Sequence, residues 1–410
     1  MPQIHRRHLL AGGAALLAPL PQARAQARTP LRIGVLADFS GPYRDTSGPT
    51  AFACAQQAAQ DLDLSARGIQ VEFLQGDHQN KPDLALALAR RWIDQDGVDM
   101  ICEVNNSAVA LAVAGLVQEK NKVQVNTGAL SAVLTGEQCS SHTVHWTADT
   151  WMLANTVGKA TVRNGGDSWF LIVADYAFGH QMQRDLTRFI EGSGGKVAGA
   201  VRFPFPGTTD FASFLVQAQS SRAKVVGLLM AGADMVNCIK QAREFGVARR
   251  GVKLAGTPMF VTDIHALGLD MAQGLLLAEA FYWDLNDRTR GFLERVKPKV
   301  ANNWPNQEHA GTYSGVLHYL KAVADLGLPA AKANGLEVVN RMKAMPTDDD
   351  CFGPGILRAD GRKIHPSYLF EVKAPGESRG PWDYYKLSGT VAAEEAFRPI
   401  SDGGCPLVKA

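Results

Sequence analysis

The sequence has no strong excess of charge of either sign. Its 42 Lys and Arg residues nearly balance its 40 Asp and Glu residues, so the formal net charge at pH 7 is +2. Acidic and basic residues are interspersed along the chain, and no basic cluster stands out. Proteins that bind nucleic acids usually carry such a cluster, so we expect no nucleic acid partner.

No internal stretch is apolar over the roughly 20 residues that a bilayer span requires. The run from Leu9 to Leu20 is shorter, follows Arg6-Arg7, and precedes small-x-small sites at Ala23-Arg24-Ala25 and Ala25-Gln26-Ala27. This order is typical of a signal peptide, which we predict over residues 1–27. We therefore expect a soluble protein that is exported to the periplasm by the Sec or the twin-arginine route.

Cysteine is scarce, and its spacing fits no metal site. The six cysteines form no C-x-x-C pair, and none lies near a histidine at the spacing of zinc ligands. We therefore predict neither a metal nor a cofactor. Cys139 and Cys405 lie in polar loops rich in Ser, Gly and Pro, and we predict a disulfide between them, which an oxidising compartment permits. We expect the cysteines at positions 54, 102, 238 and 351 to be buried free thiols.

Motifs of secreted α/β enzymes are missing as well. The sequence has no nucleophile elbow and no H-E-x-x-H motif. The glycines at 192–195 precede a predicted strand and lack a following Gly-Lys-Ser/Thr, whereas a phosphate loop opens a helix. We predict a protein without catalytic residues. A hydrolase with a Ser/His/Asp triad is the alternative from another class.

The pattern that is present is a repeated alternation of short apolar runs and helical segments. In the first half we predict strands at 31–37, 71–75, 99–104, 122–126 and 144–147, with helices at 49–62, 82–96 and 107–118. The order restarts with strands at 168–174, 197–204, 225–230, 252–255 and 275–280, helices at 178–192, 211–220 and 233–245, and later helices at 289–300, 310–326 and 337–345. Such alternation predicts an α/β fold with doubly wound parallel sheets. Because single cores stop growing near about 250 to 300 residues, we expect two lobes.

The segment after Cys351 follows a different pattern. We predict an antiparallel hairpin of Gly355–Arg358 and Tyr368–Val372 around an Asp360-Gly361 turn. The predicted lobes are 31–148 plus 281–351 and 149–280 plus 352–373, with three crossovers near Ala148, Ala280 and Cys351. Residues 374–410 are predicted to form a loop-rich C-terminal tail.

The topology also locates a site, because open parallel sheets bind ligands beyond the carboxyl ends of their strands. This rule selects six loops, which are Phe39–Arg44, Asn105–Ser107, Thr127–Ser131, Asp175–Phe178, Ala231–Asp234 and Thr257–Asp263.

Several segments resemble the branched-chain amino acid receptor-like family of periplasmic solute-binding proteins. They are Ala37-Asp38-Phe39-Ser40-Gly41-Pro42-Tyr43-Arg44, Leu134-Thr135-Gly136, Asp175-Tyr176-Ala177-Phe178-Gly179, Asp210-Phe211 and 239–246. The resemblance runs from Leu31 to about Val372 and implies a type I periplasmic binding protein, or Venus flytrap, that closes around a small molecule and delivers it to an ABC permease. It also implies a monomer.

In this family the ligand carboxylate is held by loops after the third and fourth strands, which correspond here to 105–107 and 127–131. Both loops precede helices, whose N-termini favour anions. Asn106 and Ser107 are equally well explained as helix caps. The family's acidic residues for an α-ammonium have no clear match at Ala148-Asp149-Thr150-Trp151 or Thr257-Pro258-Met259-Phe260.

Aromatic residues are concentrated on the predicted cleft loops and crossovers, which suits a planar ring with a carboxylate. The sequence most resembles the subgroup that takes up aromatic acids. Branched-chain amino acid or amide binding, and a sensory receptor lobe without transport, are the alternatives. The predicted ligand contacts are Tyr43, Asn106, Ser107, Ala129, Ser131, Trp151, Tyr176, Asp234, Phe260, His309 and Tyr313.

Overall fold

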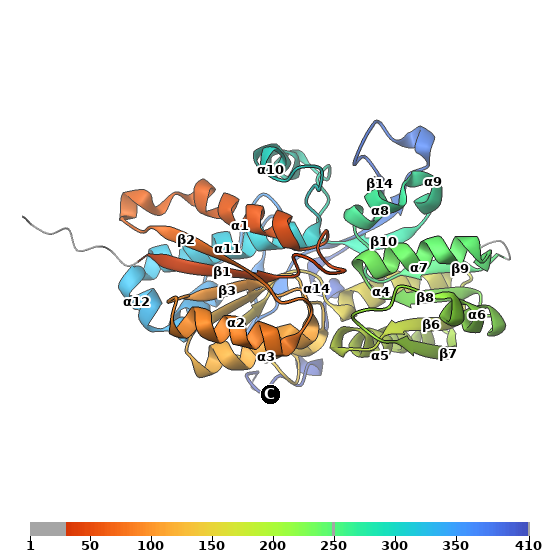
Figure 1. Cartoon of the computed structure of the whole chain (residues 1–410), viewed down its shortest axis with the longest axis horizontal. Coiled ribbons are helices and arrows are strands. Elements are labelled where there is room, and N and C mark those ends of the chain that lie inside the picture. Colours follow the sequence, from red (N-terminus) through yellow and green to blue (C-terminus); the bar gives the residue numbers. More distant parts are fainter. Residues whose placement is uncertain (1–29, 248–250, 409–410) are drawn as a thin grey trace, which may run out of the picture.

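Two α/β lobes lie side by side in the computed structural model, which describes residues 30–247 and 251–408 (Figure 1). The predicted signal peptide at 1–27 lies outside the described residues. In the described ranges, no helix combines the length and the apolarity needed to cross a membrane. The doubly wound α/β architecture is the predicted one.

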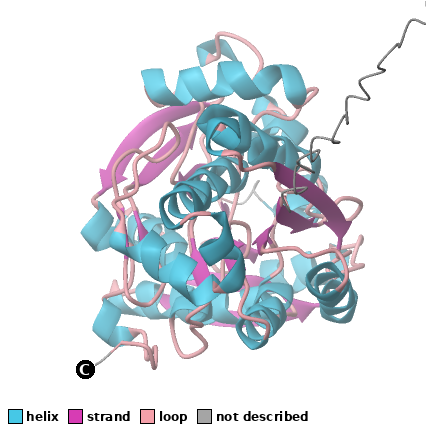
Figure 2. Cartoon of the chain, turned by 90° about the vertical axis from the view of Figure 1, so that its left-hand side faces the viewer, coloured by secondary structure: helices cyan, strands magenta, loops and turns pink. Residues whose placement is uncertain are grey.

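Lobe 1, at the left of Figure 1, is built on a parallel sheet of strand order β2-β1-β3-β4-β5. Its strands are β1 (Leu31–Ala37), β2 (Val71–Asp77), β3 (Met100–Glu103), β4 (Val123–Asn126) and β5 (Thr143–His145). Helices surround these strands in the end-on view (Figure 2). One face carries α1 (Gly48–Leu62), α11 (Gln307–Leu326) and α13 (Gly335–Ala344), and the other carries α2 (Pro82–Asp94) and α3 (Ser107–Glu119).

Glycine determines how closely one of these helices approaches the sheet. A Cβ atom at Gly34 of β1 or at Gly76 of β2 would lie 2.6 Å from the ring of Trp92. The two glycines therefore leave the space that this fully buried indole of α2 occupies. Helices α10 (Asp287–Val296) and α12 (Leu328–Ala333) complete lobe 1.

Lobe 2 repeats the arrangement around a parallel sheet of order β7-β6-β8-β9. Its strands are β6 (Ser168–Ala174), β7 (Lys196–Phe203), β8 (Val225–Leu229) and β9 (Lys253–Gly256). Helices α4 (Thr150–Arg163) and α5 (Ala177–Gly192) pack on one face, and α6 (Ala212–Ser220), α7 (Gly232–Glu244) and α8 (Val261–Leu267) on the other, followed by the short α9 (Leu269–Ala272).

The C-terminal part differs from the prediction. The Asp360-Gly361 turn does close a hairpin, but it joins β11 (Ile356–Leu357) to β12 (Lys363–Ile364). The strand predicted as its partner, β13 (Ser367–Val372), pairs instead with β10 (Leu276–Glu279) and β14 (Tyr385–Val391). The reason is local, because Asp360 accepts the backbone N–H of Arg362 and pairs with Arg358, which confines the hairpin to the residues beside the turn.

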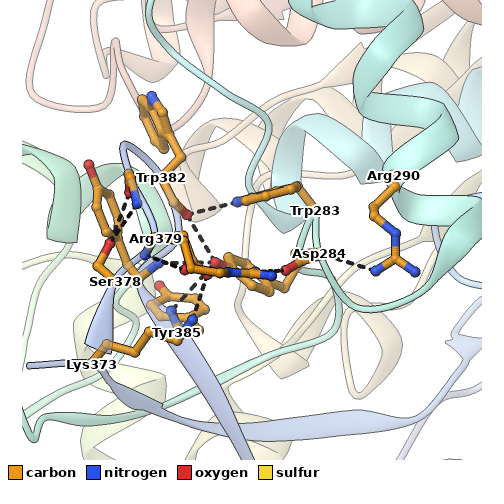
Figure 3. Close-up of polar contacts among 12 residues, drawn as sticks. Trp283, Asp284, Arg290, Lys373, Ser378, Arg379, Trp382 and Tyr385 are labelled. Atoms are coloured by element: carbon orange, nitrogen blue, oxygen red, sulfur yellow. Dashed lines mark hydrogen bonds and ion pairs between the residues drawn. The ribbon is translucent and has the colours of Figure 1, made fainter. Parts of the chain in front are cut away.

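Strand β14 lies in the segment predicted as loop, and its connection to β13 is held by polar contacts to the end of β13 and to the segment after β10 (Figure 3). Asp383 accepts hydrogen bonds from Arg379 and pairs with Lys373. The indole N–H of Trp283 donates to the carbonyl of Trp382 at 2.8 Å. The exact lobe boundaries predicted from the sequence stay a prediction.

In the described part of the chain, three crossovers join the lobes, after β5, after β10 and between β12 and β13. The residues from 392 to 405, here called the C-terminal strap, add a further connection. They leave β14, pack α14 (Ala393–Ala396) against α4, and reach lobe 1, where the Arg398 guanidinium donates to the Ala132 carbonyl.

The strap ends in a disulfide between Cys405 and Cys139, the predicted pair. The other four cysteines are buried and free within the described ranges, also as expected. The covalent bond therefore fastens a segment that starts in lobe 2 to a loop of lobe 1.

We predict that the double substitution Cys139→Ser and Cys405→Ser lowers the free energy of unfolding by about 2–5 kcal/mol, because the cross-link closes a very long loop in the unfolded chain. Urea denaturation of the mature protein measures this loss. Reductant should bring the unmodified protein to the same midpoint and leave the variant unchanged. Equal midpoints for both proteins without reductant would contradict a stabilising role.

Candidate ligand-binding pocket

A pocket lies where the carboxyl ends of the two parallel sheets face each other. With the lobes in this arrangement its free volume is only about 10 Å³, close to the space of one water molecule. All six loops selected from the sequence contribute to its wall. The lining residues are Tyr43, Thr46, Asn105, Ser107, Gly128, Leu130, Tyr176, Phe178, Ala231, Pro258 and Glu308.

The loop after β1 is shaped by one buried carboxylate, Asp38. Its Oδ1 accepts the backbone N–H groups of Ser40 and Gly41, and its Oδ2 accepts the N–H of Tyr43 and the side-chain amide of Asn80. A Cβ atom at Gly41 would lie 2.6 Å from Asp38 Oδ2, so a larger residue would displace this network. The carboxylate thus holds the loop that presents Tyr43 to the pocket.

Tyr43 meets Tyr176 of the other lobe. Their hydroxyl oxygens are 2.7 Å apart, and Phe205 stacks on both rings, with centroids 5.2 Å from Tyr43 and 4.5 Å from Tyr176. Burial raises the pKa of both phenols, so both stay protonated. The N–H of Ala233 also donates to the Pro42 carbonyl at 2.9 Å. These contacts join lobe 1 to lobe 2 across one side of the pocket.

The opposite side presents hydrogen-bond donors. Asn105 Oδ1 accepts from the N–H of Asp38 and from His78 Nε2, which fixes the amide orientation. Asn105 Nδ2 and the Ser131 hydroxyl are buried and have no hydrogen-bond partner among the described residues. The Ser107 oxygen accepts the N–H of Ser131 at 3.2 Å, which leaves its own proton available. Ser107 is also the first residue of α3, whose N-terminus favours negative charge.

A buried carboxyl group lies directly beneath this side. Glu103 and Val104 have φ angles of 76° and 57°, a conformation that non-glycine residues adopt at a cost. The carbonyl of Glu103 accepts the N–H groups of Thr127 and Gly128. Burial raises the pKa of the Glu103 carboxyl to about 8, and the neighbouring Ser47 hydroxyl opposes part of this rise. Glu103 is therefore mainly protonated at pH 7.

A second acid, Glu308, lines the pocket, and a third, the predicted Asp234, lies near Tyr43 and Tyr176 but outside the pocket lining. Glu308, in the first turn of α11, has its pKa raised well above the usual range by burial and by the nearby Glu103. Asp234, in the first turn of α7, has its pKa raised to about 7 by burial. Its Oδ2 has no hydrogen-bond partner within the described ranges. The pocket thus contains acids that can accept or donate a hydrogen bond, depending on pH.

Glu279, the last residue of β10, joins the elements that carry these groups. Its Oε1 accepts the N–H of Val261 at 3.0 Å and the hydroxyl of Tyr385 at 2.9 Å. Its Oε2 faces the N–H of Gln307 at 3.4 Å, and the N–H of Ala280 donates to the Gln307 side chain at 2.9 Å. The N-termini of α8 in lobe 2 and α11 in lobe 1 therefore meet at one carboxyl group.

The structure brings some of the predicted residues to the pocket. Tyr43, Ser107 and Tyr176 line it. Ala129 and Ser131 are buried beside the lining residues of the same loop. Their contact with a ligand stays a prediction.

Other predicted residues support the wall from behind. Asn106 caps α3, accepting the N–H groups of Ala108 and Val109, so the capping interpretation describes its contacts. His309 Nε2 donates to the Ser47 carbonyl, 2.9 Å away, and so ties α11 to the loop after β1. Phe260 is fully buried at the start of α8.

Two predicted aromatic residues lie elsewhere. Trp151 packs edge-on against Phe189 and beneath the Arg188 guanidinium, in a groove between α4 and the C-terminal strap. The Tyr313 hydroxyl donates to Asp61 at 2.8 Å, within the lobe 1 core. The structure does not bring either ring into the pocket lining.

Several residues at the pocket were not among the ligand contacts predicted from the sequence. They are Thr46, Asn105, Gly128 and Glu308 in the lining and Glu103 beneath it. Asn105 and Gly128 lie on selected loops and could have been found from position alone. Glu308 follows a helix cap, where an acidic residue is favoured by the helix dipole whatever its function. Nothing in the sequence around Glu103 distinguishes it from an ordinary strand residue.

Comparisons with known proteins agree with this geometry. The profile of a family described as periplasmic binding protein matches residues 30–379. A periplasmic binding protein from Burkholderia mallei has 41% sequence identity, with a TM-score of 0.88 over 93% of this chain and 99% of that chain. A branched chain amino acid ABC transporter periplasmic ligand-binding protein from Burkholderia xenovorans LB400 has 37% identity and a TM-score of 0.79, covering 92% and 99%.

A more distant likeness shows the fold alone. An ABC transporter solute-binding protein from R. palustris, solved in complex with benzoate, has 19% identity and a TM-score of 0.78, with 92% of this chain and 100% of that chain covered. A comparison with curated proteins finds no significant match.

We predict that Gly128→Ala disrupts the pocket wall and destabilises the protein by about 1–3 kcal/mol, the usual cost of overpacking. The added Cβ would lie 2.1 Å from Glu103 Oε2 and 2.5 Å from Asn105 Cβ. The matched control is Gly115→Ala in α3, where a Cβ meets no atom of the described chain within 4 Å. That change should stabilise by up to roughly 1 kcal/mol. Equal thermal midpoints for the two variants would contradict the packing argument.

Proposed function

Because the chain belongs to the periplasmic binding protein family, of the branched-chain amino acid receptor-like type, we propose that it captures a small aromatic carboxylate for an ABC importer. Proteins of this family bind small molecules for ABC transporters and are not enzymes. We further propose that the protein acts in the periplasm, as a monomer, and closes its lobes around the ligand. Named transporter components among its structural relatives support transport rather than sensing alone.

The observation that carries this proposal is the combination of an aromatic wall and open donors in one pocket. Tyr43, Tyr176 and Phe178 supply ring faces and edges. Asn105 Nδ2 is a buried donor that no described residue uses. A ring against the aromatic wall would direct its carboxylate toward this amide, Ser107 and the N-terminus of α3.

Proteins of the same fold support a ligand of this class. Solute-binding proteins from R. palustris were solved with benzoate and with 4-hydroxybenzoate. A para hydroxyl on the ring would have acceptors here, since Glu308 lines the pocket and Asp234 carries an unused oxygen among the described residues. Hydroxylated benzoates are therefore the ligands we favour.

A second candidate is a branched-chain amino acid. Its α-ammonium group would pair with Glu308 or Asp234 in ionised form, and the relative from Burkholderia xenovorans is described as a branched chain amino acid transporter component. Thermal-shift screening of the mature protein with benzoate, 4-hydroxybenzoate, leucine and valine separates the candidates, because a ligand that binds the folded state raises its midpoint. Stabilisation by leucine or valine alone would overturn the aromatic proposal.

We predict that Tyr176→Ala weakens binding of 4-hydroxybenzoate by at least about tenfold, because it removes a stacking surface and the contact to Tyr43. Tyr176→Phe keeps the ring and should lose much less affinity for 4-hydroxybenzoate. Tyr368→Ala is the control, since Tyr368 lies on β13 outside the pocket lining. Titration calorimetry measures all three. Equal losses for Tyr176→Ala and Tyr368→Ala would contradict a role of the Tyr176 ring in the pocket.

We predict that affinity for an aromatic carboxylate falls as pH rises from about 6 to 9. With pKa values of about 8 for Glu103 and about 7 for Asp234, both groups lose protons in this range and add negative charge near the ligand. Glu103→Gln should reduce the fall in affinity at the upper end of this pH range, and Asp234→Asn should reduce it at the lower end. Affinity that instead increases with pH would indicate a cationic ligand group.

A further inference from the structure

A second concentration of buried polar groups lies at the hinge, where two crossovers run side by side. His145 ends β5 and forms a parallel bridge with Arg362, which lies just before β12. Lys363 and His365 follow, on the way to β13. All four side chains are at most 1% exposed. None of them lines the pocket described above.

These groups have little compensation inside the protein. In the described part of the chain, Arg362 Nε, Nη1 and Nη2 make no hydrogen bond, and neither does Lys363 Nζ. The carboxylate nearest to Arg362 is that of Asp149, whose Oδ2 is 3.6 Å from Nη1 and whose Oδ1 caps α4. The neighbouring Arg358 is paired with Asp360. Asp360 also lies near Arg362, and Asp349 and Asp348 lie near Lys363, but within the described residues none of these carboxylates hydrogen-bonds to either cation.

The imidazoles beside these cations also have ring nitrogens without hydrogen-bond partners among the described residues. Neither ring nitrogen of His145 and not Nε2 of His365 has a hydrogen-bond partner within residues 30–247 and 251–408. The Ala129 and Ala148 carbonyls lie near His145 but outside hydrogen-bonding geometry. Burial lowers the pKa of both imidazoles, so each is neutral with one N–H. His365 Nδ1 donates that proton to the Pro366 carbonyl at 2.9 Å, so His145 is the imidazole with an N–H left to donate.

A ring from the C-terminal strap closes this region. The Arg362 guanidinium carbon lies 4.2 Å from the centroid of Phe397, and the His365 ring meets the same phenyl group at 5.0 Å and 90°. Lys363 Nζ lies over Trp146 and Phe352, at 5.4 Å and 5.0 Å. These aromatic rings pack directly against the buried cations. They suit a small, weakly hydrated ion.

An unpaired buried charge costs several kcal/mol unless a counter-charge and hydrogen bonds offset it. We propose that the hinge holds a small monovalent inorganic anion, of the size of chloride, bound by the Arg362 guanidinium and the N–H group of His145 beneath Phe397. The anion touches residues of two crossovers and of the strap, so it stabilises the hinge. The proposal does not rest on the identity of the ligand in the pocket.

The test compares chloride with gluconate, an organic anion too large for the site, at equal ionic strength and without any aromatic ligand. Raising chloride to about 100 mM should increase the thermal midpoint of the mature protein by about 1–3 °C over gluconate, with saturation. Arg362→Met keeps the apolar stem and should abolish the difference. Arg379→Met, which removes a 70% exposed arginine, should keep it.

Crystals grown with bromide provide a test that does not depend on a variant folding. An anomalous peak in contact with Arg362 and a neighbouring imidazole would support the anion site. Equal midpoints in chloride and gluconate, together with only water at this position, would overturn it. Retention of the chloride effect by a folded Arg362→Met protein would also overturn it.

Discussion

The junction between the two lobes depends on one buried carboxyl group. Glu279 lies at the end of β10, where the chain leaves lobe 2, and it accepts hydrogen bonds from the start of α8 and from Tyr385 of β14. It also faces the first N–H of α11 in lobe 1. Burial raises its pKa to about 8, so the group is held mainly in its neutral form at pH 7. A neutral acid can accept hydrogen bonds from several donors at this junction without the desolvation cost of a full charge. The position of Glu308 at the pocket, on the first turn of α11, follows from this contact.

Much of the fold could be predicted because local pattern and tertiary structure agree. Strands β1 and β6 are buried apolar runs between polar loops, and their predicted bounds coincide with the observed ones. Helix α4 was not predicted, because ten of its residues are buried, including Thr150, Asn155 and Thr156, and so no polar face marks the helical period. Strand β14 was hidden because its residues show no apolar alternation: Leu387 is exposed beside the exposed Ser388, as edge-strand positions allow.

The position of the pocket could be predicted more reliably than the residues that form it. The rule for parallel sheets names loops, and all six named loops reach the wall. Whether an aromatic side chain on such a loop turns toward the cleft depends on packing that no local pattern records. Tyr43 turns inward because Asp38 fixes its loop, whereas Tyr313 turns into the lobe 1 core toward Asp61. Phe205, which stacks on both pocket tyrosines, lies between β7 and α6, outside every selected loop.

Buried polar groups without a hydrogen-bond partner occur at the pocket and at the hinge, the two places where the lobes meet. The groups at the pocket are mainly acidic and those at the hinge mainly basic. The pocket collects buried acids and an unused amide, while the hinge collects buried cations and imidazoles, as far as the described residues show. Direct pairing of charges across either junction would stabilise one state, but breaking such a pair on opening would leave uncompensated buried charge. Polar groups whose hydrogen bonds are completed by a bound small molecule or ion avoid that cost, because opening of the lobes exposes these groups to water. In the proposed function, occupancy rather than internal salt bridges then sets how far the closed state is favoured, which is the coupling that a receptor for a transporter requires.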